Sequence, residues 1–291
     1  MADILFVRKA PIPTFFLRRF SRVYPALAVF ATGLYVASTV LTHFGLPKGM
    51  SISLPEYLSG MTFTSNYYQI ITNTRSVIGH LWSLSVEEHT YVVLAILAVI
   101  TARNIGVGAA ICACIAVACM INGVLQTIVG HIDGQSVYWR TDVHMGSILI
   151  SAAMALSLTG RKIPTFAAPV AGIASLILFV LTPDVIRYTI GTAMLAFSVN
   201  SLTSAGPFTH RILSAPWLRF IGTISFSLYL WQQPFYKLSE RLPAIATPFL
   251  LIAAFVCAFI SFKIIEGPAR DRINRWWGKP ERVANPALSE A

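Results

Sequence analysis

Residues 80–101 read HLWSLSVEEHTYVVLAILAVIT, an apolar run with polar side chains gathered in its first half. Residues 81–101 match the roughly 20 residues that a helix needs to cross a bilayer. Glu87, Glu88 and His89 lie well inside this run. Ionisable groups at such a depth are costly in lipid, so they usually face the bundle interior or a wet cavity. The stretch predicts a membrane helix with inward-facing polar residues, which form either a functional site or a structural polar cluster.

The composition of the whole chain agrees with a membrane protein. Of its 291 residues 55% are hydrophobic and 12% are charged, with a mean hydropathy of +0.66. Soluble domains have about 25% charged residues. The composition therefore excludes a solvated globule and a disordered chain. The net charge of +10 comes from basic residues scattered between apolar runs, so nucleic acid is not predicted as a partner.

Apolar segments recur along the chain and predict an all-α, polytopic transmembrane helix bundle of about eight spans. The predicted spans are residues 23–42, 81–101, 105–130, 143–158, 164–181, 185–202, 217–236 and 244–265. If the N-terminus is cytoplasmic, sixteen Lys and Arg residues fall on the cytoplasmic side and six outside. This asymmetry predicts that both termini are cytoplasmic. Residues 43–80 then form the longest outside loop, which we expect to pack back over the bundle.

An arginine cluster precedes the first predicted span. Arg19 and Arg22 are three residues apart, so on a helix they share a face, and Arg18 lies beside them. Two guanidinium groups side by side can grip a phosphate or a pyrophosphate. The same cluster is also typical of a membrane anchor that contacts anionic lipid and needs no ligand.

Three further motifs are weak when each is taken alone. Arg140 and Asp142 precede the span at residues 143–158, where an ion pair at the mouth of the span is the simpler interpretation. Residues 224–234 (ISFSLYLWQQP) are typical of helix packing and interface anchoring. Residues 261–268 (SFKIIEGP) close the last span with a carboxylate and a proline.

Taken together and in order, these motifs resemble the membrane acyltransferase-3 family, integral-membrane O-acyltransferases that modify bacterial polysaccharides, lipids and small molecules. The resemblance covers about residues 4–276. The sequence differs from the family pattern at three positions. It has His89 where Gln is usual, Phe226 where Tyr is usual and Gln232 where His is usual. The similar elements are Arg18-Arg19-x-x-Arg22-x-Tyr24-Pro25, His80 to Glu88, Arg140 and Asp142 with Gly146, Ser225 to Gln232, and Ile265-Glu266-Gly267-Pro268.

The resemblance implies a domain organisation and a reaction. The family has ten spans, so residues 1–276 would form its membrane domain without the first two spans, and residues 277–291 a disordered cytoplasmic tail. Acyl-CoA would be the co-substrate on the cytoplasmic side, with no permanently bound cofactor and no metal. The family's general base is a histidine in the first span, which is not among these residues. The implied site residues are Arg18, Arg19 and Arg22 for the donor phosphates, Glu87 and Glu88 inside the cavity, Arg140 and Asp142 shaping the outer acceptor side, and His80 and Trp82 on that acceptor side.

The expected function is a membrane O-acyltransferase of the bacterial inner membrane. It would move an acyl group, expected to be acetyl, from acyl-CoA to a hydroxyl of an envelope polysaccharide, a lipid or a small molecule. The alternative is a catalytically inactive, truncated paralogue that acts as a binding or partner protein. A transporter-like protein is a third hypothesis, although it does not explain the ordered motifs. Without the histidine base, we expect the 291-residue chain alone to show little or no transfer.

Overall fold

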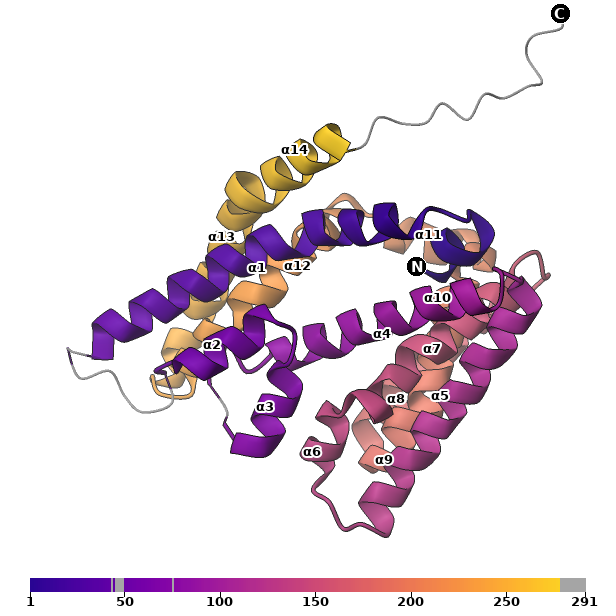
Figure 1. The fold of residues 1–291 in the computed structure, drawn as a ribbon, viewed down its shortest axis with the longest axis horizontal. Coiled ribbons are helices and arrows are strands. Elements are labelled where there is room, and N and C mark those ends of the chain that lie inside the picture. The colour runs from indigo at the N-terminus through magenta and orange to yellow at the C-terminus, as the bar shows by residue number, and fades with distance from the viewer. Residues whose placement is uncertain (43, 45–49, 75, 278–291) are drawn as a thin grey trace, which may run out of the picture.

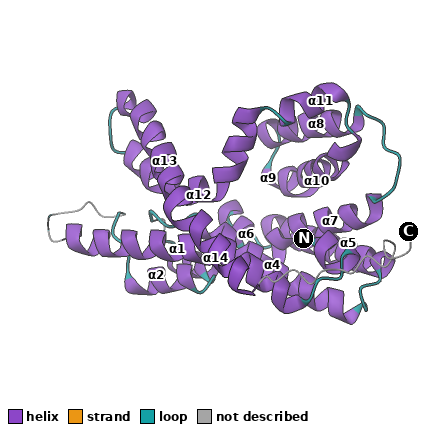
Figure 2. Cartoon of the chain, turned by 90° about the horizontal axis from the view of Figure 1, so that it is seen from above, coloured by secondary structure: helices purple, strands orange, loops and turns teal. Residues whose placement is uncertain are grey.

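The computed structural model describes residues 1–42, 44, 50–74 and 76–277, and helices account for all of the regular structure in these ranges (Figure 1). No strand occurs within the described part of the chain (Figure 2). The prediction of an all-α bundle is confirmed. The predicted tail at 277–291 falls, beyond its first residue, outside the described residues.

Five helical segments are long and apolar enough to cross a membrane within the described residues. Three further predicted spans correspond to helices that are shorter, interrupted or less apolar, so the count of eight stays a prediction. The five are α1 (Ile12–Thr42), α4 (Leu81–Ile100), α5 (Ile105–Ile128), α7 (Thr141–Leu158) and the run Ala244–Trp276, which contains α13 (Thr247–Ser261). The other three are α8 (Ala167–Leu181), the series α9 (Asp184–Ile186), η2 (Arg187–Gly191) and α10 (Thr192–Ser201), and α12 (Pro216–Ser239).

Two helices extend beyond the predicted spans. The first helix begins at Ile12 rather than at residue 23, because Phe15 and Phe16 extend its apolar face and partner carboxylates allow Arg19 to be buried. The last helix does not end at residue 265. It continues through a π-helical turn, η5 (Phe262–Glu266), into α14 (Gly267–Trp277). Pro268, which has no backbone N–H to donate, lies just after this π-helical turn.

The segment after α1 packs back over the bundle, as predicted. Its described part forms α2 (Leu54–Met61) and α3 (Ser65–Thr72), which contact α1 and α4 (Figure 1). The side chain of Ser53 accepts a hydrogen bond from the Glu56 N–H and so caps α2. Two other short helices, α6 (Gly134–Trp139) and α11 (Pro207–Leu213), lie in the connections between long helices.

Two clusters of buried apolar side chains hold the helices together. One cluster contains Phe6 of η1 (Asp3–Val7), Leu94 of α4 and Leu149 of α7. The other joins α1, α2, α4 and α12 around Phe30 and Leu230. Because lipid tails are as apolar as these side chains, tight packing rather than hydrophobic burial stabilises such contacts. Helix α4 contributes to both clusters, and residues 87–89 lie in the stretch of α4 between them.

Helices α5 and α7 approach each other closely through small residues. A Cβ atom added at Gly146 of α7 would lie 2.9 Å from Cys119 Cβ and 3.1 Å from the Ala116 carbonyl oxygen of α5. Small residues at such contacts are typical of membrane helix pairs. The faces turned away from the bundle keep large apolar side chains exposed, as at Val180, which is 74% exposed, and Phe249, which is 71% exposed. The chain is therefore built as an integral membrane protein.

Candidate functional site

Arg19 and Glu88 form a buried ion pair between α1 and α4. Arg19 Nη2 lies 2.6 Å from Glu88 Oε1, and Arg19 Nε lies 3.1 Å from the same oxygen. Nη2 also lies 3.3 Å from Glu87 Oε1. The Arg19 side chain is only 8% exposed. A buried guanidinium is stable only when carboxylates and hydrogen bonds compensate for the lost water, and the two glutamates supply that compensation.

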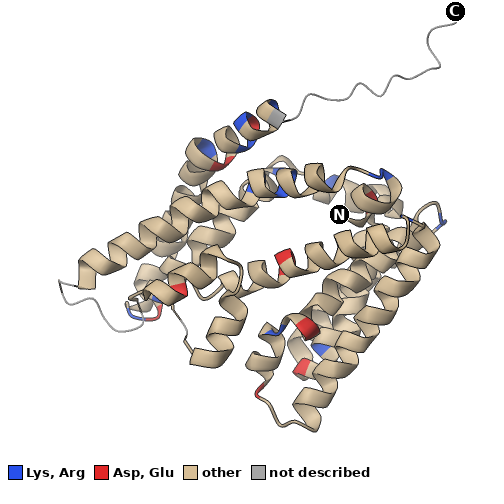
Figure 3. Ribbon diagram, viewed as in Figure 1, with Lys and Arg blue, Asp and Glu red and all other residues tan. Residues whose placement is uncertain are grey.

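Tyr91 completes this cluster one turn further along α4. Its hydroxyl donates to Glu87 Oε1 at 2.6 Å, and the Arg19 Cζ atom lies 3.5 Å from the centre of its ring. Residues 87 and 91 are four apart, so they share a helix face. We call Arg19, Glu87, Glu88 and Tyr91 the Arg19 cluster. Figure 3 shows acidic residues in the middle of an otherwise uncharged α4.

The two adjacent glutamates face different cavities, because neighbouring residues on a helix point about 100° apart. Glu87 lines a cavity of about 370 Å³ between α1, α4 and α12, here called the donor cavity. Glu88 and His89 line a second cavity of about 330 Å³ that also contacts Phe63. Arg19 lines both cavities and so separates them.

The donor cavity combines two guanidinium groups, a carboxylate and several hydroxyls. Arg22 lines it from α1 and makes no hydrogen bond or ion pair with the described residues. On the other walls, Tyr229 Oη lies 2.9 Å from Ser83 Oγ and donates to the His80 carbonyl oxygen at 2.6 Å. The described lining consists of Met1, Arg19, Arg22, Val23, Ser83, Leu84, Glu87, Tyr91, Ser225, Phe226 and Tyr229.

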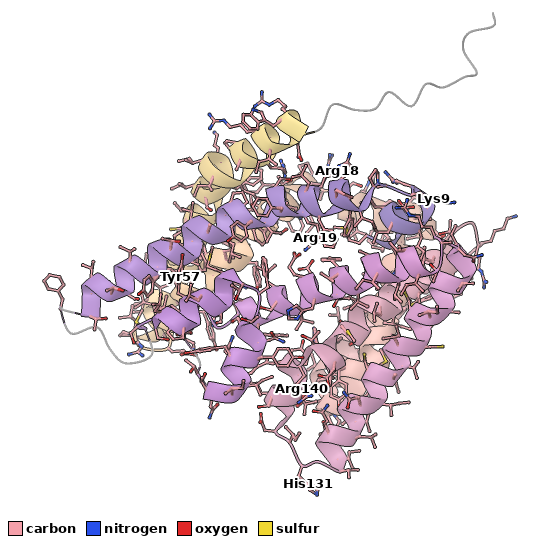
Figure 4. All side chains as sticks on the ribbon, viewed as in Figure 1. Lys9, Arg18, Arg19, Tyr57, His131 and Arg140 are labelled. Carbon is pink, nitrogen blue, oxygen red and sulfur yellow. The ribbon has the colours of Figure 1, made fainter. Side chains whose placement is uncertain are left out.

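Arg18 lies apart from this cavity. Figure 4 shows Arg18 and Arg19 on opposite sides of α1, and Arg18 is not among the residues that line the donor cavity. Of the three arginines predicted to hold donor phosphates, the structure therefore gives Arg19 carboxylate partners, leaves Arg22 open to the cavity and turns Arg18 away. Their roles toward a donor stay predictions.

His80 and Trp82, predicted on the acceptor side, lie in two different aromatic groups. The His80 ring packs against Tyr229 and Phe30, with ring centres 4.9 Å and 5.8 Å away. The ring nitrogens of His80 are buried and make no hydrogen bond of ordinary geometry with the described residues. The Trp82 ring packs edge-on against Tyr138 and His144, with centres 5.1 Å and 5.2 Å away.

Arg140 and Asp142 form the predicted ion pair at the start of α7. Arg140 Nε and Nη2 lie 3.0 Å and 2.9 Å from the two Asp142 carboxylate oxygens. Asn122 of α5 also donates to Asp142 Oδ2 at 3.0 Å. The hydrogen bond from Arg140 to Asp142 raises the pKa of that guanidinium, so it stays charged.

The structure brings Arg19, Glu87 and Glu88 into contact but keeps Arg140 and Asp142 out of that cluster. The two groups are connected through residues that adjoin them in sequence. His89, next to Glu88, has its Nδ1 atom 2.9 Å from Oγ1 of Thr141, which lies between Arg140 and Asp142. Among the described residues, no group of three or more His, Cys, Asp or Glu side chains is placed to hold a metal ion.

Sequence reasoning missed Tyr91 and the hydroxyl role of Tyr229. The signal for Tyr91 was its position four residues after Glu87. Tyr229 lies in the segment interpreted as helix packing, and its contact with Ser83 spans 146 residues of sequence, so no local pattern could reveal it. Glu266, in the closing motif, is 2% exposed and accepts a hydrogen bond from Ser227 at 2.7 Å.

Comparison of the sequence with known proteins shows its family. The sequence pattern of the acyltransferase-3 family, described as an acyltransferase domain, matches residues 4–265. The chain belongs to the acyltransferase-3 family. Among the family's curated members, the peptidoglycan O-acetyltransferase OatA of Listeria monocytogenes (serovar 1/2a, strain EGD-e) is 25% identical, over 88% of this chain and 46% of its own length.

Two other relatives carry provisional names. YrhL of Bacillus subtilis (strain 168), provisionally named a peptidoglycan O-acetyltransferase, is 26% identical over 88% of this chain and 45% of its own length. A Staphylococcus aureus protein (strain COL), provisionally named an O-acetyltransferase, is 22% identical over 89% of this chain and 48% of its own length. The chain thus spans about half the length of the curated relatives it matches. No solved structure matches it.

Proposed function

We propose that this chain is a membrane O-acyltransferase that moves an acetyl group from acetyl-CoA to a hydroxyl of an envelope polysaccharide. Family membership and the O-acetyltransferase names of its relatives support the reaction class. The relatives named for peptidoglycan support a polysaccharide rather than a lipid or a small molecule as acceptor. The single observation that carries the proposal is the donor cavity, where Arg22, which has no partner among the described residues, faces a cluster of carboxylate and hydroxyl groups.

Arg22 is the residue we assign to the donor phosphates. The guanidinium of Arg19 already bonds to Glu88 and Glu87, whereas Arg22 has no such partner among the described residues. A free guanidinium binds phosphate oxygens through charge-assisted hydrogen bonds. Arg19 then helps through its positive charge, because charge that develops on the thioester carbonyl oxygen is stabilised by fixed donors in a site that excludes water.

Glu87 is assigned to orienting groups in the cavity rather than to removing the acceptor proton. Its Oε1 atom accepts hydrogen bonds from Tyr91 and Arg19. Its contribution is to fix the direction of Arg19 and of the Tyr91 ring, which together form one wall of the donor cavity.

A second candidate function is supported by the described lining of the donor cavity, which contains no histidine. General base assistance contributes about 10²–10⁴-fold to such reactions. In this alternative, the 291 residues bind donor or acceptor without turning them over, as an inactive relative or a partner of an active enzyme.

The deciding experiment measures donor binding and acetyl transfer separately on the whole chain in lipid nanodiscs. Radiolabelled acetyl-CoA is the donor probe, and acetyl-pantetheine, which has the thioester without the nucleotide phosphates, is the matched control. We expect acetyl-CoA to bind and acetyl-pantetheine to bind at least tenfold more weakly. Transfer to peptidoglycan fragments above the rate without protein supports the enzyme, and binding without transfer supports the second candidate. Equal binding of both probes contradicts the phosphate role of Arg22.

We also propose that both termini face the cytoplasm of a bacterial inner membrane. The support is the sixteen-to-six distribution of Lys and Arg residues. Reporter fusions at residues 47 and 162 should report opposite sides of the membrane. Identical reports from the two fusions would contradict this orientation.

A further inference from the structure

A third cavity lies between α6, α8 and the α9–η2 turn, and it shares no lining residue with the two cavities around Arg19. Its volume is about 320 Å³. Figure 1 shows α6 and α9 next to each other, and a Cβ atom added at Gly134 would lie 2.8 Å from Asp184 Oδ2. We call it the α6–α9 pocket. Besides Gly134, its lining consists of Gln135, Tyr138, Phe179, Asp184, Arg187 and Tyr188.

The pocket brings aromatic rings together with a small set of polar groups. Arg187 Nη1 donates to Asp184 Oδ1 at 3.0 Å, and the two side chains are 38% and 59% exposed, so both can reach a ligand. The Arg187 Nε atom is buried and finds no hydrogen-bond acceptor among the described residues. Apolar walls with a few fixed polar groups are typical of small-molecule sites.

This combination matches the chemistry of a sugar ring. A sugar presents C–H groups on its faces, which pack on aromatic rings, and hydroxyls around its rim, which need donors and acceptors. Tyr138 is 39% exposed and offers such a ring. Burial and the charge of Asp184 raise the pKa of the Tyr138 hydroxyl, so it stays protonated and can donate. Small-molecule sites range over about 300–1,000 Å³, and this pocket, at the small end, suits a single sugar unit.

The pocket is connected to the residues predicted to shape the acceptor side. The Tyr138 ring centre lies 5.1 Å from that of Trp82 and 4.5 Å from that of His144. Arg140 follows Tyr138 by two residues, and Figure 4 places Arg140 and His131 at the same end of the molecule. The Lys and Arg distribution puts this end outside the cytoplasm, where an envelope polysaccharide is found.

We propose that the α6–α9 pocket is a saccharide subsite that holds one sugar unit of the acceptor. This assignment rests on the proposed function, because it takes the acceptor to be a polysaccharide. Asp184, Arg187 and Gln135 bind the hydroxyl or amide groups of that unit, and Tyr138 packs against its face.

The test measures binding of the peptidoglycan disaccharide N-acetylglucosaminyl-N-acetylmuramic acid to the whole chain in nanodiscs, without any acyl donor. Asp184→Asn should weaken binding about tenfold or more, as expected when a hydrogen bond to a charged group is lost, whereas Tyr138→Leu and Gln135→Ala remove neutral groups and should each weaken it about two- to tenfold. Glu240→Gln is the matched control, because Lys237 and Glu240 form an i,i+3 ion pair at 3.0 Å like that of Arg187 and Asp184. It should bind the disaccharide as the unchanged chain does.

The thermal midpoint of every variant checks its folding. If Asp184→Asn fails to fold, Gln135→Ala still tests the pocket, because it leaves the ion pair intact. Disaccharide binding that none of the three substitutions weakens would overturn the subsite, as would absence of binding to the unchanged chain. Acetyl transfer to a simple alcohol separates the two proposals. Transfer without disaccharide binding contradicts the subsite and leaves the proposed function. Disaccharide binding that the pocket substitutions weaken, with no transfer, contradicts the proposed function and leaves the subsite.

Discussion

Two of the chain's arginine–carboxylate groups have similar chemistry but lie in different surroundings. Arg19 is 8% exposed and contacts Glu87 and Glu88, which lie 68 and 69 residues away in sequence. Arg140 is 35% exposed, and its partner Asp142 is 41% exposed and two residues away. The first pair joins two membrane helices, and the second closes on itself at the start of one helix.

The difference shows what burial adds to an ion pair. In an exposed pair the remaining charge stays hydrated when its partner is removed. Such a pair therefore contributes only about 0–1 kcal/mol to the free energy of unfolding. Removal of one partner from a buried pair leaves an uncompensated charge and costs about 3–5 kcal/mol. Arg19 is therefore expected to fix the packing of α1 on α4, whereas the packing depends less on Arg140, whose acceptor-side role stays a prediction.

The largest effect is expected from Arg19→Met. The substitution leaves Glu87 and Glu88, whose side chains are 39% and 17% exposed, without their guanidinium. We expect the free energy of unfolding to fall by about 1–3 kcal/mol, less than for a pair in which both partners are fully buried. Unfolding in mixed micelles with increasing sodium dodecyl sulfate measures this change. Arg19→Lys keeps the charge and should recover part of it. A loss below about 1 kcal/mol for Arg19→Met would mean that the buried pair behaves like the exposed one.

The next effect concerns the one arginine of the donor cavity that has no partner among the described residues. Arg22→Ala should weaken acetyl-CoA binding about ten- to a hundredfold, because a hydrogen bond to a charged group contributes roughly 1.5–3 kcal/mol. Its effect on unfolding should be small, since no described residue bonds to it. Arg22→Lys should rescue binding poorly because the fork geometry is lost. Full rescue by lysine would make the cluster only a membrane anchor.

A smaller effect is expected at the exposed pair. Arg140→Ala should reduce the free energy of unfolding by no more than about 1 kcal/mol, because Asp142 stays partly exposed and keeps its bond to Asn122. If the acceptor-side role is right, the KM for the acceptor rises while acetyl-CoA binding is unchanged. A loss of stability as large as that of Arg19→Met would erase the contrast between the two regions.

The smallest effect is expected from Glu56, a carboxyl that is 3% exposed and has a serine rather than an arginine as its partner. Burial raises the pKa of the Glu56 carboxyl, and its bonds to Ser76 and to the backbone at Ser53 partly offset this shift. The folded state therefore holds the proton more tightly than the unfolded state does. This stability is fully present below the ordinary glutamate pKa of about 4.3 and is lost as the pH rises through the raised value.

Thermal midpoints of the unchanged chain and of Glu56→Gln, measured from pH 4 to pH 8, check this expectation. The difference between the two chains should shift with pH in favour of the glutamine variant as the pH rises. Glu240→Gln, which removes a carboxyl whose side chain is 44% exposed, is measured beside it as the comparison at an exposed position. A difference that is constant with pH would show that Glu56 titrates as an ordinary surface carboxyl.

The features that depend on residues close together in the chain were predictable from its sequence. Apolar runs, the Lys and Arg distribution and the ordered motifs were enough to predict an all-α membrane bundle and its family, because helix formation and membrane insertion depend on residues close together in the chain. Adjacent glutamates must diverge on a helix, so the separate directions of Glu87 and Glu88 also followed from spacing alone. The ion pair of Arg140 and Asp142 lies two residues apart and was foreseen for the same reason.

Only the tertiary structure decided which polar groups meet. It paired Arg19 with Glu88 of another helix, left Arg22 facing the donor cavity, brought Tyr229 to Ser83 and closed the α6–α9 pocket around Tyr138 and Asp184. These contacts join segments of the chain that are far apart, and their partners depend on how helices rotate and cross when they pack. The spacing of residues within one helix does not determine how a neighbouring helix is rotated. A charge buried in a bundle stabilises the packing that brings a compensating partner to it.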